Sequence, residues 1–147
     1  MKTKSTRSAA IKRRRGKAAF NPRDLIRQAI RARSSAHAPY SRFRVGAALR
    51  TRDGRVVTGC NVENASYGLT ICAERNAVAA AVAAGHKTFS ALAVVAEGTL
   101  PYPCGACRQV LAEFCGDDFP VYIATASQPG KWLALRLGEL LPCRFNF

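Results

Sequence analysis

The sequence has few acidic residues, few cysteines and no long apolar segment, and these shortages exclude several classes of protein. No apolar run approaches the roughly 20 residues of a membrane span, so a membrane protein is excluded. Six cysteines in 147 residues are about 4% of the chain, well below the density of a secreted disulfide scaffold. Eleven glycines are too few for a collagen-like repeat. The basic beginning of the chain lacks the apolar stretch of a signal peptide, which favours a cytoplasmic protein.

Positive charge dominates the composition, with 23 Lys and Arg against nine Asp and Glu and a net charge of +14. Eight of the basic residues lie between residues 1 and 18, and the first acidic residue is Asp24. The remaining chain has 15 basic and nine acidic residues, a net charge of +6. We expect a disordered basic tail over residues 1–18, which cannot bury enough apolar surface to fold, and one domain over residues 19–147. Weak polyanion binding through the tail and an organelle-targeting role both stay open.

The domain begins with a helix and a β-hairpin. Asn21 can cap a helix, Pro22 suits its first position, and Asp24 favours the positive end of the helix dipole. This helix is expected to end near residues 34–35. Apolar residues then recur with period two from Phe43 to Leu49, which predicts a strand. A turn at residues 52–55 and a returning strand over residues 56–61 complete the hairpin.

Helices and strands alternate in the rest of the chain. Residues 72–84 are Ala-rich and apolar on nearly all sides, which predicts a buried helix that ends at Gly85. A second helix is expected at residues 105–114 and a helical turn at residues 137–141. Short apolar runs predict strands at residues 91–96, 121–125 and 132–135. This order indicates an α/β sandwich in which an antiparallel hairpin leads into a mostly parallel sheet.

Three cysteines lie in two short motifs at the expected starts of two helices. Cys72 opens a Cys-Ala-Glu motif, and Cys104 and Cys107 form a Cys-x-x-Cys pair 32 residues later. The intervening chain is long enough for a helix, a strand and a turn, which can bring the two helix starts together. Three thiolates would suit tetrahedral Zn²⁺ and leave its fourth position to water, as in a catalytic zinc site. Glu74 would then reach that water and exchange protons with it.

Other interpretations of these residues stay open at this point. Cys104 and Cys107 could form a redox disulfide, or a fourth thiol could close a structural zinc site. Cys115 lies about 12 Å from Cys107 along the helix axis, which argues against it as a fourth ligand. The spacing does not exclude Cys60. Glu74 could be a surface helix residue, although its neighbours are apolar.

The two motifs resemble those of the cytidine deaminase family of zinc hydrolases. They read Cys-Ala-Glu-Arg at residues 72–75 and Pro-Cys-Gly-Ala-Cys-Arg-Gln at residues 103–109. The resemblance extends from about Asp24 to Phe145 and includes residues 38–41, 43–48 and 61–64. It implies a three-layer α/β/α sandwich with a mixed sheet of about five strands. It also implies a pyrimidine-salvage enzyme that converts cytidine, and 2′-deoxycytidine, to the uracil nucleoside and ammonia.

The resemblance assigns roles to individual residues. It implies that Cys72, Cys104 and Cys107 hold one Zn²⁺ per subunit while Glu74 shuttles protons. The residues implied to contact the nucleoside lie elsewhere in the chain. Asn61 and Glu63 would bind the ribose 3′-hydroxyl, Phe43 would pack on the pyrimidine, and the backbone of Ala73 would contact the base edge.

Four further residues receive supporting roles from the resemblance. Arg75 would offset the surplus negative charge of three thiolates on one divalent ion, and Gln109 would support this region from outside the ligands. Phe145 resembles the C-terminal aromatic residue that tetramers of the family insert into a neighbouring subunit's site, and Tyr67 falls in a segment used at subunit contacts. Both are therefore expected among the substrate-binding residues. Because the chain is short, it resembles the homotetrameric branch of the family, in which sites lie near subunit interfaces.

The chain departs from the family pattern at Tyr102, usually a small hydroxyl residue, at Cys143, commonly glycine, and in its basic tail. The tail keeps two alternatives open: deamination of cytosine in single-stranded nucleic acid, and a non-enzymatic, zinc-stabilised nucleic-acid binding module. The pair Asn61 and Glu63 favours a free nucleoside, because it is suited to bind a ribose hydroxyl. Together with Phe43, that pair also argues against a deaminase for a nucleoside antibiotic.

Overall fold

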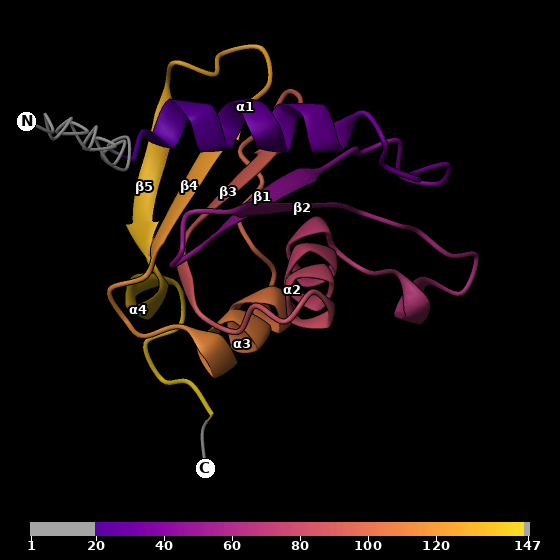
Figure 1. The fold of residues 1–147 in the computed structure, drawn as a ribbon. Helices are drawn as coiled ribbons and strands as arrows, with labels where there is room; N and C mark the ends of the chain where they lie inside the picture. Colours follow the sequence, from indigo (N-terminus) through magenta and orange to yellow (C-terminus); the bar gives the residue numbers. More distant parts are fainter. Residues whose placement is uncertain (1–19, 146–147) are drawn as a thin grey trace, which may run out of the picture.

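The structure is a computed structural model that describes residues 20–145, so the expected tail at residues 1–18 lies outside the described residues. Five strands form one mixed sheet, with α1 on one face and α2 and α3 on the other (Figure 1). This arrangement confirms the α/β sandwich. The elements in chain order are α1 (Pro22–Arg33), β1 (Gly46–Thr51), β2 (Val56–Cys60), the 3-10 turn η1 (Tyr67–Leu69), α2 (Ala73–Ala83), β3 (Phe89–Ala96), α3 (Gly105–Phe114), β4 (Pro120–Thr125), β5 (Trp132–Arg136) and α4 (Leu137–Leu140).

The mixed sheet of about five strands that the resemblance implies is confirmed, whereas the mostly parallel sheet expected from the order of elements is wrong. The strand order is β2-β1-β3-β4-β5, and among these strands β3 and β4 form the one parallel pair. Strand β1 is antiparallel to both of its neighbours, and β5 is antiparallel to β4. The crossover through α2 does join two strands of the same direction, β2 and β3. However, β1 lies between β2 and β3. These two strands therefore do not pair with each other, and each pairs antiparallel with β1 instead.

Alternate residues of the central strands face two separate apolar clusters. Ala47 and Leu49 of β1 pack with α2 and α3, whereas Ala48 packs with Leu25 and Ile26 of α1. Helix α1 starts as expected, because the Asn21 side chain accepts a hydrogen bond from the backbone N–H of Arg23. Period two in the strands therefore distributes the core to both sides of the sheet.

Two glycines allow helices to approach the sheet closely. A methyl group at Gly46 in β1 would lie 2.0 Å from the carbonyl oxygen of Ala29 in α1. A methyl group at Gly59 in β2 would lie 2.5 Å from both the carbonyl oxygen of Ala73 and the nitrogen of Ala77 in α2. The first turn of α2 is thus seated directly on the backbone of β2.

The chain before β1 is a loop, where period two predicted a strand from Phe43. The Asn61 side chain bonds to both ends of this segment: its Oδ1 accepts from the N–H of Val45 at 2.8 Å, and its Nδ2 donates to the carbonyl of Phe43 at 2.8 Å. Arg42 has a φ of 58°, which turns the chain just before this segment. Hydrogen bonds from the Asn61 side chain thus replace the strand-to-strand backbone hydrogen bonds that the period-two pattern predicted for this segment.

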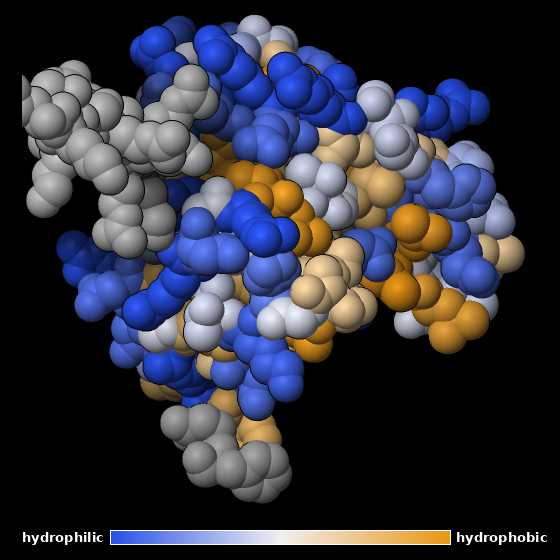
Figure 2. Space-filling view, viewed as in Figure 1, coloured by the Kyte–Doolittle hydropathy of each residue, from blue (hydrophilic) through white to orange (hydrophobic). Residues whose placement is uncertain are grey.

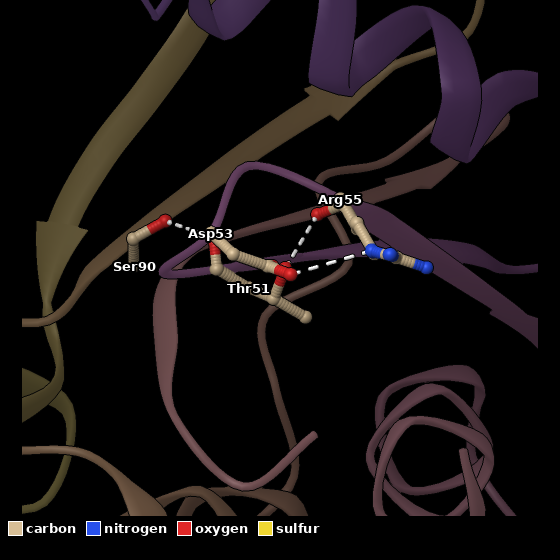
Figure 3. A network of polar contacts seen from close by, with 4 residues as sticks. All are labelled: Thr51, Asp53, Arg55 and Ser90. Atoms are coloured by element: carbon tan, nitrogen blue, oxygen red, sulfur yellow. Dashed lines mark hydrogen bonds and ion pairs between the residues drawn. The ribbon is translucent and has the colours of Figure 1, made fainter. Parts of the chain in front are cut away.

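The hairpin between β1 and β2 is fixed by a small polar network (Figure 3). The Thr51 hydroxyl lies within hydrogen-bonding distance of the Asp53 carboxylate and of the Arg55 carbonyl, and Asp53 pairs with the Arg55 guanidinium at 3.3 Å. Ser90 of β3 donates to the carbonyl of Thr51 at 3.2 Å. Hydrogen bonding to Thr51 is the main reason that the pKa of Asp53 is lowered.

Helix α2 is less buried than its composition predicted. Glu74, Ala77 and Ala81 lie in the core, but Ala79 and Ala80 are exposed. Because the helix is apolar on nearly all sides, its solvent-facing side is formed by alanines. Within residues 20–145, every helix is too short or too polar to cross a membrane.

Candidate metal centre and active site

The N-termini of α2 and α3 bring three cysteine thiols together. Cys72 directly precedes α2, Cys104 directly precedes α3, and Cys107 lies in the first turn of α3. The sulfur of Cys104 lies 3.7 Å from that of Cys72 and 3.5 Å from that of Cys107. All three sulfur atoms lie within 4.8 Å of one another, which confirms the predicted convergence of the two motifs.

The geometry and chemistry of these thiols fit zinc. Four ligands at the usual Zn–S distance of about 2.3 Å stand about 3.8 Å apart at the corners of a tetrahedron, close to the separations observed. The cysteines are free, so a disulfide between Cys104 and Cys107 is not formed. Among residues 20–145, the group of side chains able to hold a metal contains these three thiols and neither Cys60 nor Cys115. Three soft ligands leave the fourth position open, as catalytic zinc sites do.

Hydrogen bonds from neighbouring side chains favour the thiolate form of Cys72. Hydrogen bonding to Cys107 and to Arg75 lowers the pKa of Cys72 to about 5, against an ordinary value of 9.0. The Arg75 Nη2 lies 3.7 Å from the Cys72 sulfur and also donates to the carbonyl of Thr70 at 3.2 Å. Arg75 therefore stands where it can offset the charge of three thiolates, as the resemblance implies.

Glu74 is a buried acid beside the three thiols. Its exposed fraction is 5%, so the alternative of a surface helix residue is wrong. Burial, with a contribution from the charge of Cys72, raises the pKa of Glu74 to about 7, against an ordinary value of 4.5. A carboxyl with this pKa takes up and releases protons near neutral pH, which suits general acid–base chemistry.

A pocket of about 270 Å³ opens next to the thiols. Its walls combine an apolar side, a polar end and the metal centre, so it can hold a small molecule of mixed polarity. Five of the predicted substrate and catalytic residues line it together. The lining residues are Ser41, Phe43, Val45, Asn61, Glu63, Thr70, Cys72, Ala73, Glu74, Pro101, Tyr102 and Cys104.

The polar end of the pocket is formed by Asn61 and Glu63, both buried. The Glu63 carboxylate accepts hydrogen bonds from the N–H groups of Tyr40 and Ser41, at 2.9 and 3.2 Å, and from the Ser41 hydroxyl. The bond from the Ser41 hydroxyl is the main reason that the pKa of Glu63 is lowered. Both side chains thus shape the loop before β1, a structural role that sequence reasoning missed, and both still border the pocket.

Four other residues with expected roles lie away from the pocket walls. Arg75 contacts the thiols from outside, as described. Gln109 donates from Nε2 to the carbonyl of Phe145 at 2.8 Å, so it anchors the end of the described chain. Tyr67 and Phe145 are 68% and 67% exposed, and neither lines the pocket of its own chain.

Sequence reasoning also missed residues that hold the ligand-bearing segments in place. Asn76 donates from Nδ2 to the carbonyl of Cys60 at 2.8 Å, which ties α2 to the end of β2. Arg108 donates to the carbonyls of Pro103 and Leu140, at 2.7 and 2.6 Å, which ties the Cys104 loop to α4. Arg108 is part of the quoted motif and could have been singled out, whereas nothing in the sequence marks Asn76.

A family model described as the cytidine and deoxycytidylate deaminase zinc-binding region matches residues 21–123. The chain belongs to this deaminase family. Zinc is accordingly the metal of the deaminase, and the three-thiol cluster is the part of the described chain that suits it.

Known deaminases are similar to the chain over most of its length. A cytidine deaminase of Halalkalibacterium halodurans is 52% identical over 123 residues, which cover 83% of this chain and 92% of the relative. The crystal structure of cytidine deaminase from Burkholderia pseudomallei has a TM-score of 0.80 and 48% identity, and the match covers 86% of this chain and 100% of that one. Cytidine deaminase from Mycobacterium tuberculosis has a TM-score of 0.76 and 45% identity, with coverages of 87% and 99%.

Proposed function

We propose that this protein catalyses the hydrolytic deamination of cytidine and of 2′-deoxycytidine, giving the uracil nucleoside and ammonia for pyrimidine salvage. The observation that carries the proposal is the pocket itself. It brings a buried glutamate, a zinc-compatible thiol cluster and a polar end with Asn61 and Glu63 into one cavity of about 270 Å³. The similarity to cytidine deaminases over more than 80% of the chain supports the same substrate.

Cys72, Cys104 and Cys107 would hold the zinc. When bound, zinc would act as a Lewis acid that lowers the pKa of the water it binds. Glu74 acts as the general acid and general base. Its carboxylate accepts a proton from the attacking water as the new bond to C4 of the cytosine forms, and delivers that proton to N3. It then transfers the second proton of the water to the departing amino group. One water is consumed, and the C4–N bond breaks to release ammonia.

The rest of the pocket orients the nucleoside. Phe43 offers an aromatic face to the pyrimidine ring, and the backbone of Ala73 lies beside Glu74 where it can contact the base edge. Glu63 stays ionised because its pKa is lowered, so its carboxylate can accept a hydrogen bond from a ribose hydroxyl. Asn61 holds the loop that carries Phe43, which couples the sugar end of the pocket to the base end.

Replacement of Glu74 tests the chemistry. We expect Glu74→Gln to keep its zinc and to lose about 10²- to 10⁴-fold or more in kcat, because the amide cannot carry the proton. Absorbance assays on cytidine measure turnover, and elemental analysis measures zinc. The matched control is Glu113→Gln on the exposed side of α3, which should change neither quantity. Normal turnover by Glu74→Gln would refute the mechanism.

The same assay separates the competing substrates. Free cytidine and a cytosine-containing single-stranded oligonucleotide are offered in parallel to the wild-type protein. We expect uridine from the first and no uracil in the second, because the pocket is small, about 270 Å³, and is lined by Asn61 and Glu63, which suit a ribose hydroxyl. Deamination of the oligonucleotide alone would favour a polynucleotide deaminase. Zinc without turnover of either would favour a binding module.

We also propose that the protein is a homotetramer whose sites lie near subunit interfaces. Large apolar side chains of the η1 region are exposed close to the pocket, with Tyr67 at 68% and Leu69 at 67%. Tyr67 contacts Tyr40 edge-on at 5.8 Å, so the patch reaches the loop that holds Glu63. The exposed alanine face of α2 adds a second surface without charge. Exposed apolar surface of this kind is typical of protein–protein contacts.

A charge placed in the η1 region tests this assembly. We expect Leu69→Asp to dissociate the tetramer in light-scattering chromatography and to raise KM, because the exposed patch adjoins the pocket. The control is Leu133→Asp on the distant strand β5, which should leave the mass unchanged. A wild-type protein that runs as a monomer, or a Leu69→Asp variant that stays tetrameric, would contradict the proposal.

We propose a cytoplasmic location on chemical grounds. The site needs three reduced thiols, and the six cysteines of the described chain are free. Such thiols persist in a reducing compartment. Expression of a tagged full-length chain followed by cell fractionation checks this location.

A further inference from the structure

Helix α1 carries a row of arginines on its solvent side. Arg23, Arg27 and Arg31 are spaced by four residues and are exposed, whereas the apolar residues of the helix face the sheet. Hydrophilic side chains gather over this helix in the space-filling view (Figure 2). The 12-residue helix contains one acidic residue, Asp24, which pairs with Arg27 at 3.3 Å.

A groove runs between α1 and the edge strand β2. It consists of two hollows, of about 200 and 330 Å³, that share Gln28. Polar side chains that can contact phosphate or bases line both hollows, notably Asn21, Ser35 and Thr58 beside Arg31 and Arg50. Asp24, which pairs with Arg27, also lines the smaller hollow. We call the three arginines and this groove the α1 surface.

Aromatic rings lie at the N-terminal end of the same surface. Phe20 is 39% exposed, and the guanidinium of Arg50 lies 5.1 Å from its ring centre. The guanidinium of Arg23 lies 5.8 Å from the ring of Trp132 in β5. Exposed aromatic rings and arginine planes are the groups on which unpaired bases stack.

We propose that the α1 surface binds single-stranded nucleic acid. Charge complementarity carries the proposal, because three exposed arginines follow one another along one side of α1. The sequence that precedes the helix, residues 1–18, adds eight basic and no acidic side chains. The groove supplies hydrogen-bonding groups along the length of the helix, and Phe20 supplies a stacking face. A lipid surface fits less well, because Leu25, Ile26 and Ala29 are buried and leave α1 without an apolar face to insert.

This surface is separate from the catalytic pocket. Helix α1 covers one face of the sheet, and the metal-binding helix starts lie on the other (Figure 1). Binding of a polynucleotide here would hold the enzyme on the polymer without presenting a base to Glu74. The inference therefore does not depend on the substrate of the pocket.

Two arginines provide a matched test. Arg27 and Arg136 are 67% and 69% exposed, and each pairs with one aspartate, at 3.3 and 3.4 Å, but Arg136 lies at the end of β5 next to α4. Fluorescence anisotropy measures binding of a labelled 20-nucleotide poly-U strand to the full-length chain between 50 and about 300 mM KCl. We expect Arg27→Glu to weaken binding about 5- to 10-fold at 0.1 M salt and to reduce the log–log salt slope by about 1. Arg136→Glu should do neither.

The outcomes distinguish the sources of binding. Equal weakening by both substitutions would show diffuse attraction and overturn the proposal. Unchanged binding by Arg27→Glu would place the contacts in residues 1–18 alone and also overturn it. Tighter binding to phosphatidylglycerol vesicles than to RNA, with the same dependence on Arg27, would identify a membrane surface instead. Cytidine turnover and thermal melting should be unchanged in Arg27→Glu, which confirms that the variant is folded.

Discussion

Substitution of Gly59 by alanine tests how tightly the metal centre depends on the sheet beneath it. The added methyl group would lie 2.5 Å from the Ala73 carbonyl oxygen and 2.5 Å from the Ala77 nitrogen. Ordinary contact begins at 3.4 Å, so β2 and the first turn of α2 must separate by about 0.9 Å. That turn carries Glu74 and directly follows Cys72, and the shift is transmitted to both.

The size of this displacement sets the expected effect. A misplacement of about 1 Å in a catalytic group is enough to cost about 10²-fold in rate. Overpacking in a filled core costs about 1–3 kcal/mol of stability. We therefore expect Gly59→Ala to lower kcat/KM for cytidine by about 30- to 100-fold, with a stability loss in the range given for overpacking.

A second glycine separates the two effects. A methyl group at Gly46 would meet α1 at 2.0 Å, a closer approach than at Gly59, but on the face of the sheet away from the thiols. Gly46→Ala should lose at least as much stability in urea titrations while it retains most of its activity per folded molecule. Gly116 has open space around it, so Gly116→Ala should change neither quantity.

Two results for the glycine variants would refute the reasoning. If Gly59→Ala and Gly46→Ala lose activity in proportion to their stability, then α2 is not held in place by its contact with β2. If Gly59→Ala keeps full activity and stability, the close approach of helix and strand is not a constraint on the site. Zinc content, measured on the same samples, shows whether Cys72 has moved out of reach.

Two further predictions concern the cysteines. Cys104→Ser should lose its zinc and its cytidine turnover, whereas Cys60→Ser should keep both, as measured by metal analysis after dialysis; zinc-free Cys60→Ser would place a fourth thiol in the site. Burial raises the pKa of Cys115 to about 12 against an ordinary value of 9.0, so the folded chain holds this proton when the unfolded chain has lost it. Stability in urea should therefore fall as pH rises from about 9 towards 12, and less steeply in Cys115→Ala; equal slopes would show that the thiol is not responsible.

The sequence predicted most elements of the fold because their signals are local. The Asn21 cap and the two Cys-containing helix starts appear where their patterns place them, and the first period-two strand appears from Gly46 onward rather than from Phe43. The pairing of the strands was predicted less well. A helical crossover gives the two strands it joins the same direction, but it does not require them to be neighbours in the sheet. Insertion of β1 between β2 and β3 depends on packing of distant residues such as Leu49 and Leu92, which pair across the sheet.

The candidate site was predicted as far as its residues lie in recognisable motifs. The three thiols and Glu74 were marked by spacing and by the apolar surroundings of the acid. The supporting contacts were not, because Asn76 and Ser41 are polar residues of ordinary appearance whose partners come from distant segments. Phe43 was expected in a strand, and the structure instead places it in a loop held by the amide of Asn61.

The thiol cluster joins segments that are 32 residues apart in the sequence, so bound zinc acts as a removable cross-link. In the unfolded chain a permanent link of this span would remove about 4 kcal/mol worth of conformational entropy. The link between α2 and α3 is present only when the metal is, and its contribution rises with the concentration of free zinc relative to the dissociation constant. The availability of the metal thus sets two quantities at once: whether the enzyme turns over its substrate, and how long the folded chain survives.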